Sequence, residues 1–327
     1  YVSCQSPDHK YWLYKYRKFS LSLHLFAAKT HSDLSCYEIN HLTEMDYQKY
    51  YEKYQEDGCI KIENFLTSEE VELMKQGLAD LMENMTEDVH VHSAYSDPKR
   101  KKDEEYYINS ADKIAYFFEG DAFDSDGNMI VEKKKALNKI AYAVHWWNPQ
   151  FKQISFSRKV KDLLRTFEYK DPVICQSMLI FKNPKIGEVF RPHQDSTFLY
   201  TEPPSSIGLW TPLEDATVEN GCLWFLPGSH KSGKIYQRYE RNPDKDPFMV
   251  MRGDLPDFDQ DKYVPIPAKK GDLVLIHGSV LHKSARNNTD KPRIVYTFHA
   301  VEKGNKWSEL NWIQATDKLP FPSIYDN

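Results

Sequence analysis

The sequence predicts a mainly β fold with flanking helices, organised as a double-sheet β-sandwich or jelly roll. From residue 172 onward the chain carries short apolar or aromatic runs, and Gly, Pro or Asn-Gly breaks separate most of them. Closely spaced short strands of this kind are typical of double-sheet β proteins. The aromatic content of 14% also favours a β-rich core. The predicted strands cover residues 173–182, 207–213, 221–226, 272–277 and 293–301.

The chain before residue 165 predicts a helical layer that packs against one of these sheets. A helix is expected over 44–55, followed by a short strand over 59–62. Thr67 and Glu70 have the spacing of a capping box, which opens a helix. The apolar stripe of that helix is expected to face the core, and it contains Val71, Met74, Leu78, Leu81 and Met82.

Three other segments have a distinct composition. Residues 86–112 are charged and irregular, and their basic run at 99–102 is expected to be a solvated loop rather than a binding patch. Residues 134–145 predict another helix. Residues 231–262 are polar and too long for a simple hairpin, so we interpret them as an insertion that covers the site as a lid.

The domain organisation follows from where periodicity begins. Residues 1–43 are rich in Tyr, Lys, Ser and His without a sustained period, which predicts a poorly ordered N-terminal extension. Residues 44–327 are expected to form a single domain. Within the extension, the segment from Arg17 to Leu25 nearly matches the nonapeptide address for peroxisomal import, but Lys18 stands where an aliphatic residue or Gln is normally required. We therefore expect a cytoplasmic protein, with the peroxisome as the alternative.

Composition excludes several classes of partner. The net charge is −5, from 43 basic and 48 acidic residues, so a generally basic nucleic-acid surface is not expected. No stretch approaches the roughly 18 apolar residues that a membrane span requires. The five cysteines are widely spaced and odd in number, which favours reduced thiols in an intracellular protein. We expect this protein to be a monomer. Cys175 and Cys222 lie in apolar runs and are expected to be buried small hydrophobic residues.

The metal-binding pattern begins at His193 and Asp195. Residues two apart in an extended segment point to the same face, so both side chains can reach one ion while Gln194 turns away. Pro192 favours an extended entry to this segment, and His282 lies far along the chain as a closing ligand at a strand end. Two imidazoles and one carboxylate on one face leave the other coordination positions free, which is the arrangement of non-haem Fe(II) oxygenases.

The choice of the distal histidine rests on local context. His277 is still inside an apolar run, where a core histidine is the simpler interpretation. His282 follows the turn at Gly278 and opens a polar stretch, where a ligand facing the mouth of the site belongs. His230 and His299 are interpreted as structural or supporting residues.

Arg293 follows His282 closely and adds a fixed cation to the pattern. A guanidinium is always charged and presents a fork of donors, which suits a dicarboxylate co-substrate. Together with the metal pattern, this residue favours an oxygenase that depends on Fe(II) and 2-oxoglutarate.

Several motifs in the same order resemble the phytanoyl-CoA dioxygenase family. They are Pro-His-Gln-Asp at 192–195, the run at 220–230 that ends in Leu-Pro-Gly-Ser-His, and His-Lys-Ser at 282–284. The string at 193–203, Glu-Asp-Ala-Thr at 214–217 and Tyr-Thr-Phe-His at 296–299 extend the likeness. The resemblance covers the chain from about residue 45 to the C-terminus and omits the N-terminal extension.

This resemblance implies a double-stranded β-helix, the cupin-like jelly roll, and a role for each matching residue. It implies that Fe(II) is held by His193, Asp195 and His282, and that Arg293, helped by Ser284, pairs with the distal carboxylate of 2-oxoglutarate. It also implies co-substrate contacts from Lys139, Met178 and Trp210. From the residues alone, Lys139 would be a solvated helix residue, and Met178 and Trp210 would belong to the core.

The implied reaction is the oxidative decarboxylation of 2-oxoglutarate to succinate and CO₂ by Fe(II) and O₂, with ascorbate in support. It would accompany hydroxylation of a small molecule, for example an acyl-CoA or lipid-like substrate. One alternative is a metal-binding jelly roll of another class, such as a hydrolase or isomerase, although Arg293 would have no purpose there. The other is a catalytically silent binding protein, which should have lost a ligand, and none is missing.

Overall fold

The computed structural model describes residues 47–85, 101–243 and 248–327. The N-terminal extension over 1–43, with its address-like segment, therefore lies outside the described residues. So does the part of the charged region that covers 86–100.

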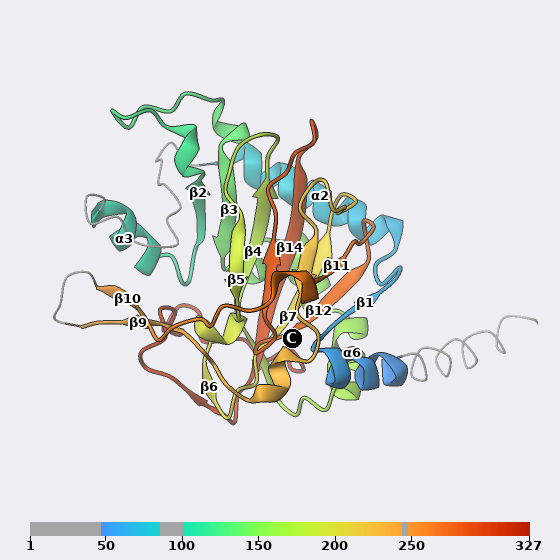
Figure 1. Cartoon of the computed structure of the whole chain (residues 1–327). Coiled ribbons are helices and arrows are strands. Elements are labelled where there is room, and N and C mark those ends of the chain that lie inside the picture. Colours follow the sequence, from blue (N-terminus) through green and yellow to red (C-terminus); the bar gives the residue numbers. More distant parts are fainter. Residues whose placement is uncertain (1–46, 86–100, 244–247) are drawn as a thin grey trace, which may run out of the picture. The chain divides into compact units, whose positions relative to one another are not determined.

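A seven-stranded antiparallel sheet is the largest element of the fold (Figure 1). Its order is β1-β12-β7-β14-β4-β3-β2, so strands distant in sequence lie side by side. The longest pairing joins β4 and β14, with Arg293 opposite Lys182 and Thr297 opposite Met178. In sheet order, the strands are β1 Cys59–Ile62, β12 Leu273–His277, β7 Ile207–Pro212, β14 Arg293–Glu302, β4 Pro172–Lys182, β3 Leu137–Tyr142 and β2 Ile114–Phe118.

A four-stranded antiparallel sheet carries the metal-binding motifs. Its order is β11-β8-β13-β5, and the strands are β11 Val264–Ile266, β8 Leu223–Phe225, β13 His282–Ser284 and β5 Phe190–His193. Two small ladders complete the strands: β9 Arg238–Arg241 with β10 Met249–Arg252, and β6 Thr201–Glu202 with β15 Lys306–Trp307.

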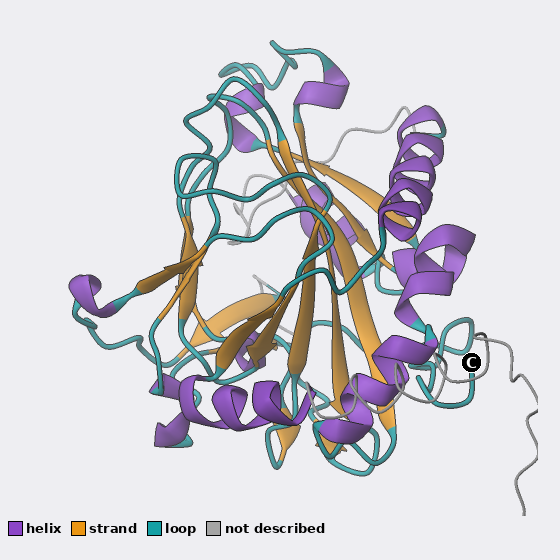
Figure 2. Cartoon of the chain, turned by 90° about the vertical axis from the view of Figure 1, so that its right-hand side faces the viewer, coloured by secondary structure: helices purple, strands orange, loops and turns teal. Residues whose placement is uncertain are grey.

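Helices cover one face of the seven-stranded sheet (Figure 2). A helix over 47–57 precedes β1, and the others on this face are α2 Ser68–Glu83, α4 Val144–Trp147, α5 Pro149–Ser155 and α6 Arg158–Thr166. The remaining helix, α3 Lys101–Ile108, packs in a different cluster with Phe117 and Tyr142. Side chains of α2, α5 and α6 share one core cluster with outward residues of β4 and β14. Residues on the opposite face, including Trp210 and Val295, pack instead against Leu223 and Phe225 of the smaller sheet. The two sheets therefore enclose an interior, as in a jelly roll.

Most sequence predictions agree with this structure. All five predicted strands after residue 172 are present, and the strand over 59–62 has the predicted bounds. Thr67 and Glu70 form the predicted capping box of α2, whose stripe packs into the core. Cys175 and Cys222 are buried free thiols, as expected.

Three predictions were wrong. Residues 134–145 form β3 and the short α4 instead of one helix, because all six residues of β3 are buried and no alternation marks the strand. The charged region contains the helix α3 where an irregular loop was expected. His282 begins β13 after a turn, whereas the sequence suggested the end of a strand.

Candidate metal and co-substrate site

Two paired strands bring the predicted metal ligands together. His193 is the last residue of β5, His282 is the first of β13, and the antiparallel register places them directly opposite each other. Their ring centroids are 4.2 Å apart. Asp195 follows β5 at the start of a short 3₁₀ turn, and one ligand atom from each of the three residues lies within 4.8 Å of the others.

Backbone contacts orient both imidazoles. Nδ1 of His193 lies 2.8 Å from the Arg191 carbonyl oxygen, and Nδ1 of His282 lies 3.1 Å from that of Val280. A carbonyl can only accept, so Nδ1 carries the proton in each ring and Nε2 keeps its lone pair. Both Nε2 atoms face Oδ1 of Asp195, at 3.8 Å and 3.5 Å.

The charge states of His193 and Asp195 suit metal binding. Burial, together with the neighbouring His282, lowers the pKa of His193 to about 4, so that ring is neutral near pH 7. Burial alone would raise the pKa of Asp195, but His282 and His299 outweigh it and hold that pKa below its usual value. A neutral imidazole nitrogen beside an ionised carboxylate is a ligand suited to Fe(II).

His299 supports Asp195 from the large sheet. Its Nε2 lies 3.2 Å from Oδ2 of Asp195, and its Nδ1 lies 3.3 Å from the Gln176 amide nitrogen. Gly208 of β7 permits this contact, because a Cβ there would come within 3.3 Å of both partners. The sequence interpretation of His299 as a supporting residue agrees with this position.

His277 faces away from the predicted ligands. Its ring packs against Tyr54 and His230, with centroids 5.7 Å and 4.9 Å away, and its Nδ1 accepts from the Ser279 amide at 3.0 Å. Burial lowers the pKa of His277 to about 4. These contacts agree with the choice of His282 over His277 as the distal ligand.

Arg293 is a buried cation with unused donors. Only 2% of the residue is exposed, and Nη2 donates to the Gly221 carbonyl at 3.1 Å. Nε and Nη1 are buried without a hydrogen-bond partner, and the described residues provide no ion pair for the guanidinium. Burial lowers the pKa of Arg293 only to about 10, so the group remains charged. Buried donors of this kind require an acceptor, and a ligand carboxylate fits them.

Ser284 joins Arg293 to the metal ligands. Its hydroxyl donates to the same Gly221 carbonyl at 2.8 Å. Ser284 follows His282 by two positions in β13, so both side chains point to one face and lie about 7 Å apart along the strand. Through this shared carbonyl, Ser284 connects the strand that carries His282 to the Arg293 guanidinium.

The other three predicted co-substrate residues lie on the interior face of the large sheet. Thr297 of the central strand β14 pairs with Met178 of β4 on one side and with Trp210 of β7 on the other. Lys139 of β3 pairs with Ile180, which lies two positions from Met178 on β4. The Trp210 ring lies 5.7 Å from the Arg293 guanidinium carbon. Trp210 is buried in the core, as the residues alone suggested.

Lys139 corrects the sequence interpretation. It is a buried strand residue rather than a solvated helix residue, with 7% exposure. Its amine lies between the rings of Tyr107, Phe117 and Tyr142, at 4.9–5.6 Å from their centroids. Burial lowers the pKa of Lys139 to about 7. The faces of aromatic rings attract a cation, so these three rings partly offset the cost of burying the amine.

Sequence reasoning gave no role to Lys182, which is 3% exposed and opposite Arg293 on β4. Its amine donates to the Glu188 carbonyl at 3.3 Å, and burial, followed by Arg293, lowers its pKa to about 7. The alternation of side chains along a strand could have indicated this position. Met178, Ile180 and Lys182 lie two residues apart on the predicted strand and therefore share a face.

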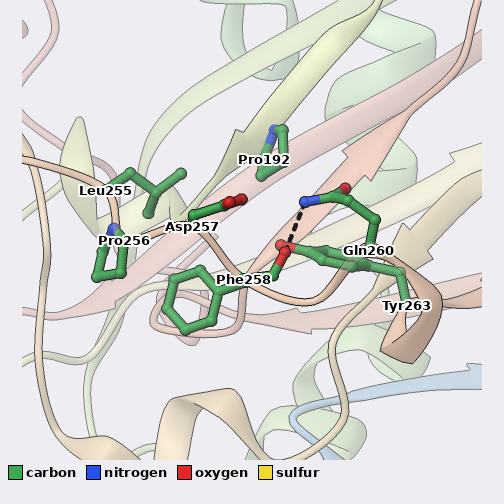
Figure 3. Close-up of a pocket in the computed structure, with 7 residues that line it drawn as sticks. All are labelled: Pro192, Leu255, Pro256, Asp257, Phe258, Gln260 and Tyr263. Atoms are coloured by element: carbon green, nitrogen blue, oxygen red, sulfur yellow. Dashed lines mark hydrogen bonds between the residues drawn. The ribbon is translucent and has the colours of Figure 1, made fainter.

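A separate cavity of about 250 Å³, lined by apolar residues together with Asp257 and Gln260, lies beside the metal-binding segment (Figure 3). Pro192 lines it from β5, and the other lining residues, which include Leu255, Phe258 and Tyr263, come from the segment 255–263. Neighbouring strand residues point to opposite faces, so Pro192 and His193 face different sides of β5. This cavity is therefore distinct from the metal site.

Comparison with known proteins identifies the family. The model of the family described as Phytanoyl-CoA dioxygenase (PhyH) matches residues 54–295. The chain belongs to this family. The expectation of a 2-oxoglutarate-dependent oxygenase is thereby confirmed at the level of the family.

Curated relatives match over nearly their whole length. The "Phytanoyl-CoA dioxygenase domain-containing protein 1" of Danio rerio is 44% identical over 292 residues, covering 87% of this chain and 99% of the relative. The protein of the same name from Rattus norvegicus is 44% identical over 281 residues, covering 84% and 96%. The Caenorhabditis elegans homologue is 41% identical over 282 residues, covering 84% and 98%.

Solved structures share the fold. The non-haem α-ketoglutarate-dependent epimerase SnoN from nogalamycin biosynthesis has a TM-score of 0.55 at 14% identity, covering 86% of this chain and 99% of that one. EctD from S. alaskensis in its apo form has a TM-score of 0.56 at 17% identity, covering 85% of each chain. These likenesses confirm the predicted jelly-roll core. Within the described part of the chain, no helix is long and apolar enough to cross a membrane.

Proposed function

We propose that this protein is an Fe(II)- and 2-oxoglutarate-dependent dioxygenase that hydroxylates a small molecule. The observation that carries this proposal is the convergence of two kinds of group on one interior. His193, Asp195 and His282 provide three neighbouring metal-ligand atoms, and the buried Arg293 has two donors without a partner. A hydrolase, or an isomerase that uses no 2-oxoglutarate, would need the metal ligands but not an unpaired buried guanidinium.

The metal would be held by His193, Asp195 and His282, and 2-oxoglutarate would complete the site. Bound Fe(II) supplies the activation of O₂, which uses the electrons released when 2-oxoglutarate loses CO₂. One oxygen atom of O₂ enters succinate and the other enters the hydroxylated substrate. Ascorbate would support activity by returning oxidised iron to Fe(II).

The chain's own residues bind and orient the reactants. One edge of the Arg293 guanidinium, made of the second Nη2 proton and a free donor on Nε or Nη1, forms a two-pronged contact with the distal carboxylate. Ser284 holds the Gly221 carbonyl that orients the guanidinium. Lys139 provides a buried amine that donates to the co-substrate, while Met178 and Trp210 shape the surface beside it. His299 keeps Asp195 turned toward the metal.

The substrate is proposed as a small molecule, with an acyl-CoA or another lipid-like compound as the first class to test. Names of relatives support this class, since the Arabidopsis thaliana relative is called phytanoyl-CoA dioxygenase. The solved structures of similar fold contain small molecules of other classes. SnoN was solved with Fe³⁺, α-ketoglutarate and nogalamycin RO, and EctD with 2-oxoglutarate and 5-hydroxyectoine.

The basic residues of the insertion give limited support to binding of the phosphate groups of coenzyme A. Arg238 lies over the Tyr200 ring and 3.5 Å from Glu240, and Arg241 donates twice to the Trp312 carbonyl. Lys231 and Lys234 are exposed cations of the described insertion, and no ion pair is seen for either within the described residues. A smaller carboxylate substrate is therefore a sound second class.

We also propose that residues 44–327 act as one oxygenase domain in a cytoplasmic monomer. The insertion over 231–262 would cover the site, and the peroxisome remains the alternative location.

Calorimetry with Mn(II), a redox-stable substitute for Fe(II), tests the proposed function. The protein should bind one Mn(II), and 2-oxoglutarate should bind more tightly after the metal is loaded, because the metal supplies part of its site. Succinate, which lacks the keto group, is the matched ligand control and should bind weakly. Binding of neither metal nor 2-oxoglutarate would contradict the proposal.

A further inference from the structure

Gln194 lies between two predicted metal ligands and is 1% exposed. Its amide nitrogen donates to the carbonyls of Lys234 and Ser279, at 2.9 Å and 2.7 Å. Its amide oxygen accepts from the Tyr236 amide at 2.9 Å. Both amide protons and the amide oxygen are therefore used, and every partner is backbone.

The hydrogen-bond partners of Gln194 belong to two segments that are distant from each other in the sequence. Lys234 and Tyr236 lie in the insertion, shortly before β9. Ser279 lies in the turn that leads to His282, and the Ser196 amide donates to the Gly278 carbonyl of the same turn at 2.8 Å. The buried side chain of Gln194 thus joins three segments: the one that carries His193 and Asp195, the turn before His282, and residues 234–236, which we call the root of the insertion.

The insertion then carries an aromatic ring toward the metal ligands. Tyr239 of β9 is buried, and its ring lies 5.8 Å from that of Phe198. Phe198 in turn lies 6.1 Å from the His193 ring. This row of rings connects the insertion to the His193 ring on one side of the predicted metal site. Its position depends on where the root of the insertion is fixed.

We propose that Gln194 is a positioning residue that fixes the insertion against the metal centre and so excludes water from it. The proposal rests on the proposed function, because the metal at His193, Asp195 and His282 is the group being shielded. Gln194 itself does not touch the metal, since its side chain points to the other face of the segment. A hydrophobic residue of similar size would fill the space but leave two carbonyls and one amide without partners.

Amide hydrogen exchange on the metal-free protein measures directly how strongly Gln194 stabilises the segments that it contacts. In Gln194→Leu, the amides at 236–241 should exchange about five- to tenfold faster, as expected for one lost hydrogen bond. Amides of β4 and β14 should keep wild-type rates, which controls for general unfolding. Gln260→Leu is the matched control, because Gln260 is an exposed residue of the same insertion, and it should leave exchange at 236–241 unchanged.

A second variant separates the two kinds of contact. Gln194→Glu keeps an acceptor for the Tyr236 amide but loses both donors and sets a carboxylate against two carbonyl oxygens. Exchange should therefore increase more at 279–281 than at Tyr236 in this variant. Equal exchange of both segments in wild type, Gln194→Leu and Gln194→Glu would overturn the proposal.

Water-proton relaxation with bound Mn(II) tests the shielding. Faster relaxation in Mn(II)-loaded Gln194→Leu than in the wild type and Gln260→Leu, at similar Mn(II) affinity, supports the proposal. Equal relaxation in all three proteins overturns the shielding role. If the wild type binds no Mn(II), the proposed function fails instead, and the exchange data still decide whether Gln194 fixes the insertion.

Discussion

Replacing Arg293 by lysine tests the co-substrate site. The guanidinium spends Nη2 on the Gly221 carbonyl and keeps Nε and Nη1 free for a ligand. Nη2 also keeps a second proton, which lies parallel to a proton of either Nε or Nη1. An ammonium cannot reproduce the two parallel contacts that such an edge offers a carboxylate. The loss of one charge-assisted hydrogen bond costs about 1.5–3 kcal/mol, which corresponds to roughly ten- to a hundredfold weaker binding of 2-oxoglutarate.

The assay is the apparent KM for 2-oxoglutarate at saturating Fe(II), obtained from succinate formation. Iron affinity should barely change in Arg293→Lys, because Arg293 is not a ligand. Arg286→Lys is a suitable control, since Arg286 is a part-exposed arginine that pairs with Asp121 at 2.7 Å. An unchanged KM in Arg293→Lys, or the same increase in Arg286→Lys, would refute the assignment of Arg293.

Ligand-induced stabilisation gives an independent measure of the same effect. At 2-oxoglutarate 100 times above its Kd, the metal-loaded wild type should gain about 2.7 kcal/mol of stability. The same concentration should stabilise Arg293→Lys by only about 0.4–1.4 kcal/mol, because its Kd is ten- to a hundredfold higher. Equal shifts in melting temperature for the two proteins would contradict the two-pronged contact.

Three further predictions address the ligands and the buried amine. His282→Ala should abolish Mn(II) binding in calorimetry, whereas His277→Ala should keep it and lower the melting temperature; the reverse result would exchange their roles. His299→Ala should weaken Mn(II) affinity about ten- to a hundredfold by releasing Asp195, and an unchanged affinity would remove His299 from the site. Lys139 has a pKa of about 7 when folded, against 10.5 for the free side chain, so the unfolded chain binds one more proton between these values. Stability should therefore rise with pH across this window, by at most about 1.4 kcal/mol per unit from this residue, and denaturant titrations of Lys139→Met should give a shallower rise.

The sequence predicted the parts of the fold that have a local pattern. The strands after residue 172 are separated by turn residues, and the capping box marks where α2 begins. The interpretation of His193, Asp195 and His282 as one group depended on a two-residue spacing and a polar context, both of which are visible in the sequence. Their roles as ligands remain predictions, although the register of β5 and β13 brings them together.

What the sequence did not predict depends on contacts between distant segments. The burial of Lys139 follows from the position of β3 beside β4 within the large sheet, and no local period reveals it. The contact of His299 with Asp195 requires β14 and β7 to pair in a particular register, with Gly208 leaving the space. The bonds of Gln194 to the insertion likewise join residues about 40 positions apart.

Turnover of 2-oxoglutarate tests the central claim most directly. Wild-type protein supplied with Fe(II), ascorbate, O₂ and 2-oxoglutarate should release succinate and CO₂ in equal amounts. Asp195→Ala should reduce succinate formation to background, because the carboxylate ligand is lost, whereas His277→Ala should retain it. Undiminished succinate formation in Asp195→Ala, or none in a wild-type protein that binds both Fe(II) and 2-oxoglutarate, would contradict the account.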